Sequence, residues 1–446
     1  MKDCQMDPSI EGGVKEIAPS LIAVHPLDKS VVVAIGPNLR IFSFGEDGTA
    51  VCHKITDRPS HSDSIRSICF DRKGDFFASA GDDKLVNIWN AYSWHCIKSI
   101  RSEKRVSAAS FSSDARYLMF ADKFGVVWIA TTSVADKMNH KDDRAEPLLA
   151  HCCSIITGLE ISPNGRFIAS ADRDFKIRVS VLPKSPLQGA HEIQSFCLGH
   201  TNFVSCISFL GIQADCEGLL ISGGGDATVR LWHYMTGELL DTYEAEVAVG
   251  LGKCSNGVDN PTSSAVTALS VSSDSSLIAV AIESLYGVLL LNCNLQSRKL
   301  ALLKKVELPD SFIPTSLAFG NCSHNLWMIT GGAEVIQLDG TNPVESEVKN
   351  LVLAASAVTR IRVIDLTYNG SSNLLESRVL DDASVPGGEK LLTVLQGDKS
   401  DMETARAAAE AANTALKNLM IKRQYSTETR ENRKKKRNDI KLKNIT

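Results

Sequence analysis

Short stretches of alternating apolar and polar residues, each followed by a polar turn and a second apolar stretch, recur along most of the chain. Three clear copies are VSAASFSSDARYLMFA (106–121), ITGLEISPNGRFIASA (156–171) and VTALSVSSDSSLIAVA (266–281). Alternation bounded by turn residues is typical of antiparallel strands that bury one side. Weaker copies occupy residues 20–42 and 314–338. The pattern predicts an all-β fold built from repeated strand pairs.

A second pattern follows these strand pairs and sets their period. SAGDDKLVNIW (79–89), SADRDFKIRVS (170–180) and SGGGDATVRLW (222–232) align without gaps around an aspartate, and FADKFGVVWIA (120–130) fits the same frame with Phe124 at that position. Each of the first three has a serine four residues before the aspartate and a histidine 22 to 26 residues before it. The matched residues are His61, Ser79 and Asp83; His151, Ser170 and Asp174; and His200, Ser222 and Asp226. Spacings of 41, 50 and 52 residues are typical of a propeller or a solenoid.

These repeats resemble the WD-repeat family over residues 20–340. The resemblance implies a seven-bladed β-propeller, in which four-stranded sheets surround a central channel. Residues 1–19 form an N-terminal segment, and residues 341–399 supply peripheral strands or a loop, between which the sequence does not decide. Residues 400–423 are rich in alanine and begin with Ser400 and Glu403 in capping-box spacing, which predicts a helix. A basic disordered tail, residues 424–446, follows.

Histidine, serine, aspartate and tryptophan can satisfy one another in a buried chain of hydrogen bonds that ties the loop entering a blade to the turn inside it. The second blade holds a full set in His61, Ser79, Asp83 and Trp89, and the fifth holds another in His200, Ser222, Asp226 and Trp232. In the fourth blade, His151, Ser170 and Asp174 are present but Ser180 takes the tryptophan position. A catalytic triad is unique, whereas this set recurs, so we expect a structural network and no catalysis by this chain.

The turn of the fourth blade carries five charged side chains within seven residues, namely Asp172, Arg173, Asp174, Lys176 and Arg178. In a strand with Ile177 facing the packed side, Lys176 and Arg178 face the other way. A single arginine at this position is explained by simple solvation of its charge, because Arg230 holds the equivalent position in the fifth blade. The cluster of three bases instead favours a binding surface.

Four segments carry a more specific resemblance: FADKFGVVW (120–128), ADRDFKIRVS (171–180), FCLGHTNFVS (196–205) and GGGDATVRLW (223–232). In this order they resemble the non-catalytic WD-repeat subunit of the eukaryotic tRNA (guanine-N7-)-methyltransferase. The resemblance implies a heterodimer in which a separate catalytic chain binds S-adenosylmethionine and methylates a guanine in the tRNA variable loop. This chain then carries no cofactor. An adaptor of a ubiquitin ligase or chromatin complex is the alternative function.

The same resemblance implies roles for the charged turn. Arg178 contacts an acidic residue of the catalytic subunit, Arg173 and Lys176 lie beside it, and Asp174 orients the turn, with Asp172 in the same surface. Phe175 departs from the family pattern, which has an acidic residue there. Val126 also departs from it, because it stands where a polar residue is expected.

The net charge of −4 divides unevenly along the chain. Residues 422–446 hold ten Lys or Arg and three acidic residues, a balance of +7, so the preceding part carries about −11. An acidic body argues against nucleic-acid binding through bulk charge. The run of five bases has three interpretations, as a nuclear import signal, a contact with tRNA phosphates or a solvated tail. Its residues are Arg433, Lys434, Lys435, Lys436 and Arg437. We expect the protein in the nucleus.

Cysteine usage and hydropathy exclude two further classes. The twelve cysteines form no C-x-x-C pair, which predicts reduced thiols and no metal site. No run of about 18 apolar residues is present, and the first residues lack a basic region followed by a hydrophobic one, so we expect neither a membrane protein nor a secreted one.

Overall fold

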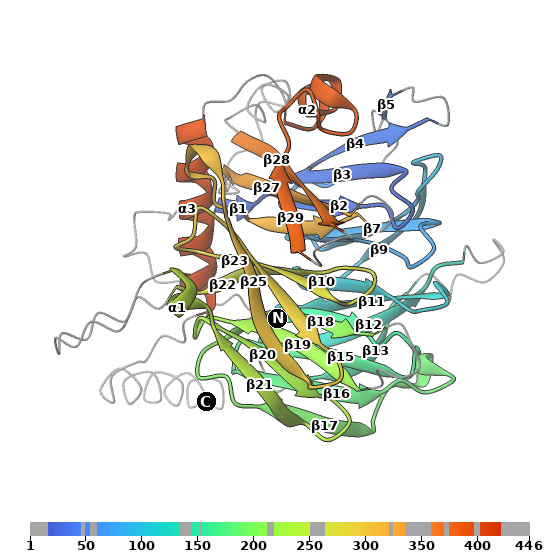
Figure 1. Cartoon of the computed structure of the whole chain (residues 1–446). Helices are drawn as coiled ribbons and strands as arrows, with labels where there is room; N and C mark the ends of the chain where they lie inside the picture. Colours follow the sequence, from blue (N-terminus) through green and yellow to red (C-terminus); the bar gives the residue numbers. More distant parts are fainter. Residues whose placement is uncertain are drawn as a thin grey trace, which may run out of the picture.

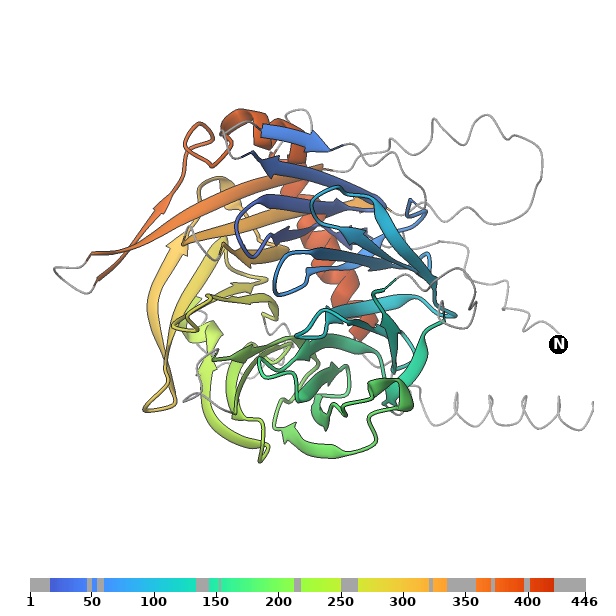
Figure 2. The same cartoon turned by 90° about the vertical axis from the view of Figure 1, so that its right-hand side faces the viewer.

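Seven antiparallel sheets follow one another around a ring in chain order, from blue to orange in Figures 1 and 2. A computed structural model describes residues 17–45, 50–53, 60–133, 144–151, 154–211, 218–249, 264–320, 324–334, 358–369, 374–396 and 402–420. The sheets make a seven-bladed β-propeller, which confirms the fold class that the repeats predict.

In the first six blades the strands pair in chain order, so each blade is a meander of four strands. The first blade contains β2 (Leu21–Val24), β3 (Ser30–Ile35), β4 (Asn38–Phe44) and β5 (Ala50–His53). The second contains β6 (Ile65–Phe70), β7 (Phe76–Gly81), β8 (Leu85–Asn90) and β9 (Cys96–Arg101). The third contains β10 (Val106–Phe111), β11 (Tyr117–Asp122), β12 (Val126–Thr131) and β13 (Glu146–Ala150).

The next three blades repeat this order. The fourth contains β14 (Ile156–Ile161), β15 (Phe167–Asp172), β16 (Lys176–Val181) and β17 (Ile193–Leu198). The fifth contains β18 (Val204–Leu210), β19 (Leu219–Gly224), β20 (Thr228–His233) and β21 (Glu238–Glu244). The sixth contains β22 (Val266–Val271), β23 (Leu277–Ile282), β24 (Gly287–Asn294) and β25 (Lys299–Glu307).

The seventh blade joins the two ends of the ring. Its sheet contains β1 (Ile17–Pro19), β26 (Ser316–Phe319), β27 (Asn325–Glu334), β28 (Val358–Asn369) and β29 (Leu374–Val379). Both β26 and β1 pair with β27, β26 through its first half and β1 through its second. The chain therefore closes the propeller with a strand from before the first blade.

The boundary predicted at residue 340 lies too early. Because β28 and β29 are the outer strands of the seventh sheet, the propeller runs from residue 17 to residue 379. The alternative of a peripheral loop for 341–399 does not hold for these two strands. Beyond them, α2 (Gly388–Gln396) packs on the first and seventh blades with Leu391, Leu392 and Leu395 buried.

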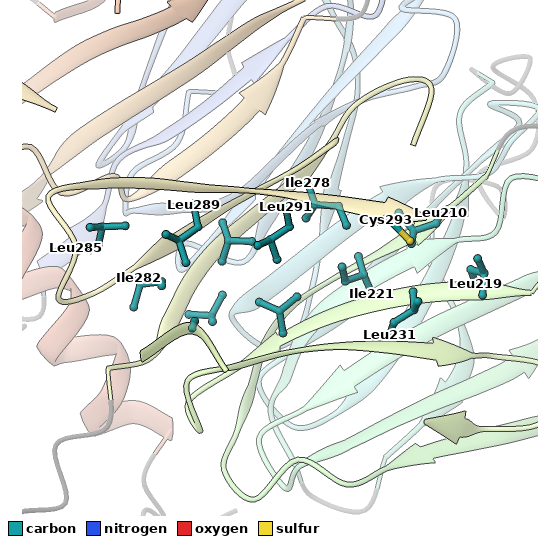
Figure 3. Packing of buried hydrophobic residues seen from close by; sticks show 14 residues of the cluster. Leu210, Leu219, Ile221, Leu231, Ile278, Ile282, Leu285, Leu289, Leu291 and Cys293 are labelled. Atoms are coloured by element: carbon teal, nitrogen blue, oxygen red, sulfur yellow. The ribbon is translucent and has the colours of Figure 1, made fainter. Parts of the chain in front are cut away.

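The blades pack through apolar side chains that alternate along their strands. Between the fifth and sixth blades, Ile221 and Leu231 face Ile278 and Leu291, and Figure 3 shows these residues interdigitating. All four are fully buried. Truncation of such a residue to alanine typically costs about 2 to 5 kcal/mol. This packing fixes each blade relative to the next and so fixes the turns at its ends.

The helix predicted at 400–423 is α3 (Met402–Met420), which lies against β27, β1 and β28 (Figure 1, red). Ala405, Ala409 and Ala412 are buried, and their small side chains let the helix approach the sheet closely. At its far end Met420 packs on Phe203 and Ala265, where the chain enters the fifth and sixth blades. The helix therefore spans one face of the ring.

Three short helical segments complete the described elements: α1 (Ala245–Val249) and 3₁₀ turns at Pro186–Gln188 and Pro309–Ser311. Among the described residues, none of the helices is long and apolar enough to cross a membrane. Over the same residues, no three His, Cys, Asp or Glu side chains gather as a metal site. The basic tail, with Arg433 to Arg437, lies outside the part of the chain that the structure describes.

Candidate docking site on the fourth blade

The second and fifth blades contain the hydrogen-bond network that the repeats predict. His61 Nδ1 lies 2.9 Å from Asp83 Oδ2, and its Nε2 lies 2.8 Å from Ser79 Oγ. Trp89 Nε1 donates to the same serine oxygen at 3.0 Å. The fifth blade repeats these contacts at 2.7 to 3.0 Å among His200, Ser222, Asp226 and Trp232.

Each group in these networks finds a partner if the histidine carries its proton on Nδ1. Burial alone would raise the pKa of Asp226, but hydrogen bonds from His200, the Thr201 amide and the Thr228 hydroxyl outweigh it and lower the pKa to about 2. The pKa of Asp83 is also lowered, since contacts with His61 offset its burial. The networks therefore fix the turns and leave no group poised for catalysis.

The fourth blade departs from the predicted network in the identity of its aspartate. His151 Nδ1 lies 2.9 Å from Asp172 Oδ2, not beside Asp174, and His151 Nε2 lies 2.7 Å from Ser170 Oγ. Asp172 is 2% exposed and also accepts the Asp174 and Lys176 amides. The assignment of Asp174 to the network was wrong, and Asp172 is a buried structural residue and not part of the docking surface.

The contacting aspartate differs between blades because of the residue that stands two positions after the network serine. The second and fifth blades have Gly81 and Gly224 there, so their carboxylate must come from two residues later. The third and fourth blades have Asp122 and Asp172 at that position. Asp122 accepts from Trp128 Nε1 at 2.9 Å, so the earlier aspartate carries the structural contact in both blades. An aspartate in place of this glycine is therefore the sequence signal that the earlier aspartate, and not the later one, makes the structural contact.

Arg178 lies between the third and fourth blades. Its Nε donates to Ser180 Oγ at 2.9 Å and its Nη1 donates to the Ala150 carbonyl of β13 at 3.1 Å. The serine that replaces the network tryptophan thus orients the arginine. Burial lowers the pKa of Arg178, although the guanidinium remains charged at any physiological pH.

Comparison with the fifth blade separates Arg178 from an ordinary solvated arginine. Arg230 Nη2 lies 3.5 Å from Asp226 Oδ2, so its charge has a carboxylate partner inside its own blade. Among the described residues, no carboxylate lies within 4 Å of Arg178, which contacts only neutral acceptors. A half-buried cation without a counter-ion is suited to an acidic group of a partner.

The other bases of the turn lie beside it with free donors. Arg173 Nε is buried and has no hydrogen-bond acceptor within the described part of the chain. Lys176 is exposed at the start of β16. Asp174 is half-buried in the same turn and has contacts of its own. The structure therefore brings Arg173, Lys176 and Arg178 to one edge of the blade.

Apolar residues that the sequence analysis did not identify complete this surface. In the register of β16 and β17, Lys176 lies opposite Leu198 and Arg178 lies opposite Phe196. Leu198 is 59% exposed and Phe196 is 42% exposed, so both large apolar side chains are open to solvent at this edge of the blade. Both residues lie in the segment FCLGHTNFVS (196–205), whose sequence does not indicate that these apolar side chains are exposed.

Phe175 projects from the same turn with an unfavourable backbone. Its φ is +70°, a left-handed conformation that is costly for a bulky residue, and its side chain is 41% exposed. The equivalent positions, Lys84, Gly125 and Ala227, are also left-handed, so the turn itself demands this conformation. The exposed aromatic ring of Phe175 adds a third apolar side chain to this edge of the blade.

We call these six residues the blade-four surface: Arg173, Phe175, Lys176, Arg178, Phe196 and Leu198. It combines three positive charges with three exposed apolar side chains. Such a surface is suited to a protein partner with an acidic side chain beside an apolar patch, because burial of the apolar groups strengthens the ion pair.

A family model confirms the resemblance of the sequence. Residues 130–330 match the model described as the tRNA methyltransferase TRM82 WD40 domain, and residues 52–90 match the WD domain, G-beta repeat. The first match covers the whole blade-four surface.

Curated relatives carry the corresponding name. The chain is 38% identical over 179 residues to the tRNA (guanine-N(7)-)-methyltransferase non-catalytic subunit WDR4 of Homo sapiens, which is 40% of each chain. It is 30% identical over 243 residues to the subunit of that name from Dictyostelium discoideum, 51% of this chain and 50% of the relative. The alignments thus span about half of the relatives' length or less.

Solved structures show the same fold at low identity. The structure of U3-55K superposes with a TM-score of 0.56 at 20% identity, covering 75% of this chain and 94% of that one. The WD40 repeats of RRP9 give a TM-score of 0.56 at 21% identity, covering 71% and 88%. These likenesses support the propeller alone.

Proposed function

Since residues 130–330 match the model of the tRNA methyltransferase TRM82 WD40 domain, we propose that the chain is the non-catalytic subunit of a tRNA (guanine-N7-)-methyltransferase. The observation that carries the proposal is the blade-four surface, which lies within the matched residues and holds Arg178 without a carboxylate partner among the described residues. The chain binds a catalytic subunit as a heterodimer and supports methylation of a guanine in the tRNA variable loop.

Arg178 pairs with a carboxylate of the catalytic subunit in this account. Its Nε and one Nη are already directed by Ser180 and Ala150, so the guanidinium loses little freedom when the carboxylate binds. Phe175, Phe196 and Leu198 exclude water from the pair. Loss of such a partly desolvated contact costs about 2 to 5 kcal/mol.

The propeller acts by selecting a conformation of its partner. Binding raises activity only if the catalytic subunit binds the blade-four surface better when its active-site loops are in the competent arrangement. S-adenosylmethionine, which supplies the transferred methyl group, binds on the catalytic subunit. The residues of this chain position that subunit and take no part in the transfer.

The tail has a separate part in the proposal. Met420, the last described residue of α3, lies beside Phe203 and Ala265, at the face of the ring that also carries the turn of the fourth blade. The ten bases of residues 422–446 follow Met420 closely in the sequence. We propose that they direct the protein to the nucleus or contact tRNA phosphates, and phosphate contacts would weaken steeply with salt.

Reconstitution tests this function. The catalytic subunit of the same organism is assayed for N7-methylation of the variable-loop guanine, alone and with the purified full chain. Co-elution of the two chains together with an increase in methylation is expected. Failure of the chains to associate, or equal methylation in both reactions, would leave the adaptor of another complex as the better account.

A further inference from the structure

The seven innermost strands place one equivalent residue each around the central channel, and one of the seven differs in kind from the rest. Each of these residues is paired with the second strand of its blade at the same register. Six are small: Ala23, Cys69, Ser110, Ser208, Ser270 and Ala318. The seventh is Glu160 on β14. A single carboxyl group therefore extends into a channel that is otherwise lined by small side chains at this level.

The channel is hollow around this carboxyl group. Glu160 lines a cavity of about 490 Å³ together with all of these small residues except Ser208. Glu160 and Ser208 line a second cavity, of about 210 Å³, that shares Arg72 and Ile161 with the first. Both lie where the innermost strands end, so they open on the face of the ring opposite the blade-four surface.

Glu160 has neither a hydrogen bond nor an ion pair among the described residues. Burial raises its pKa to about 7, and the guanidinium of Arg72 opposes this rise. Arg72 donates to the Pro163 carbonyl at 2.8 Å, which holds it at the rim. The other ionisable residues that line the cavities are Asp71, whose oxygens accept two amides of its own turn, and the half-buried Cys69. The carboxyl group of Glu160 is thus half-buried and faces the cavity without a partner among the described residues.

The walls next to Glu160 combine two further features. Val24, Phe70, Phe111, Ile161, Val271 and Phe319 supply apolar surface, whereas Ser110, Ser112, Ser270 and Ser273 supply hydroxyl groups. A slim alkyl chain fits against these apolar side chains. A group with several hydrogen-bond donors fits the serine hydroxyl groups and the Glu160 carboxylate.

We propose that the central channel binds a primary alkylammonium group, with the ammonium on Glu160 and the alkyl chain along the apolar walls. The source is a lysine side chain of a partner peptide or a free polyamine, which present the same chemistry. A carboxylate or phosphate is repelled by Glu160 once the acid is ionised. Because the Asp71 oxygens already accept amides of their own turn, Glu160 alone is too small a ligand set for a metal ion. The ammonium supplies three donors, which the carboxylate and the serine hydroxyls accept.

Proton release links this binding to pH. An ammonium stabilises the ionised carboxylate, so the group that is about half protonated at pH 7 must lose its proton when the ligand binds. The affinity therefore rises as the pH rises through 7. The ionised fraction of the free protein therefore increases between pH 6 and pH 8, and the affinity increases with it.

Calorimetric titration of the full chain with n-butylammonium chloride tests the site. Saturable binding is expected, with about half a proton released at pH 7 when two buffers of different ionisation enthalpy are compared. Glu160→Gln keeps the shape of the side chain and should lower the affinity tenfold or more. Glu238→Gln changes an exposed acid on the outer strand β21 and should leave it unchanged.

Two further ligands identify the source. Tighter binding by spermidine indicates a polyamine, whereas tighter binding by a peptide with one lysine, lost when that lysine is acetylated, indicates a protein partner. The thermal midpoint of each variant verifies its folding, and the pH dependence of the unmodified chain gives a result independent of any variant. Absence of saturable binding, or equal affinity of the Glu160→Gln chain, would overturn the proposal.

Discussion

His151 Nδ1 lies 2.9 Å from Asp172, and this aspartate stands two residues earlier in its turn than the aspartates that hold His61 and His200. Asp172 also accepts the amides of Asp174 and Lys176 from inside the turn. One buried carboxylate therefore fixes the backbone that presents Arg173, Phe175 and Lys176. The docking surface depends on this internal contact although Asp172 itself does not reach the surface.

Separate replacement of Asp172 and Asp174 by alanine tests this arrangement. Asp172→Ala leaves His151 Nδ1 and two part-buried amides without this acceptor, so we expect the free energy of unfolding to fall by about 2 to 4 kcal/mol. Asp174→Ala, the matched variant in the same turn, should cost less than about 1 kcal/mol. Urea denaturation of both chains gives the comparison. Equal losses would mean that Asp174 carries as much of the turn as Asp172.

Acid should weaken the network of the fifth blade in a defined range. The pKa of Asp226 is about 2 in the folded chain, below its ordinary value of 3.8. A carboxyl group with a lowered folded pKa contributes stability that is complete above about pH 4 and is lost as the pH falls toward 2. The contribution is about 2 kcal/mol.

Comparison of the unmodified chain with Asp226→Asn isolates this contribution. We expect the difference in the free energy of unfolding to be constant between pH 5 and 7 and to shrink below pH 4. A difference that stays constant down to pH 3 would contradict the assignment of this stability to the ionised carboxylate.

Phe175→Gly should change stability and binding in opposite directions. Glycine adopts the left-handed φ of this position without steric cost, so the free chain should gain about 0.5 to 1 kcal/mol. The same change removes an exposed aromatic ring from the blade-four surface, so the affinity for the catalytic subunit should fall.

Thermal denaturation and a binding titration on the same preparation measure both effects. Ala227→Gly, at the equivalent turn of the fifth blade, is the matched control and should leave binding unchanged. If Phe175→Gly binds the catalytic subunit as tightly as the unmodified chain, the ring is not part of the interface.

Attachment of α3 depends on small side chains in its buried stripe. Ala409 is fully buried against the propeller, so Ala409→Asp places a charge without a partner in that contact. We expect a loss of about 2 to 4 kcal/mol and earlier proteolysis of the C-terminal region. Glu403→Gln changes an exposed residue of the same helix and should have no effect. Equal proteolysis of the two variants would show that the helix is not held by this stripe.

The sequence predicts the repeated features well because the same residue types recur at the same register in several blades. His61 with Asp83 and His200 with Asp226 recur at one register, and the structure confirms their contacts. The closing strand β1 has only three residues and pairs more than 300 residues away, so no local pattern identifies it. Its position follows only from closure of the ring.

The docking site is predictable only in its charges. Arg173, Lys176 and Arg178 stand out as a cluster, but Phe196 and Leu198 belong to an outer strand with no repeated motif. Ser180 looks like a simple loss of the network tryptophan, whereas it orients Arg178 through its hydroxyl group. A replacement that removes one function and supplies another becomes visible only when the side chains are placed.

A binding titration of the purified catalytic subunit against three forms of the chain tests the central claim most directly. Arg178→Glu should weaken the complex by about 2 to 5 kcal/mol, at least about thirtyfold in Kd, because it opposes two carboxylates. Arg116→Glu reverses a 78% exposed charge on the opposite face and should bind like the unmodified chain. Equal affinity of all three forms would contradict docking through the blade-four surface.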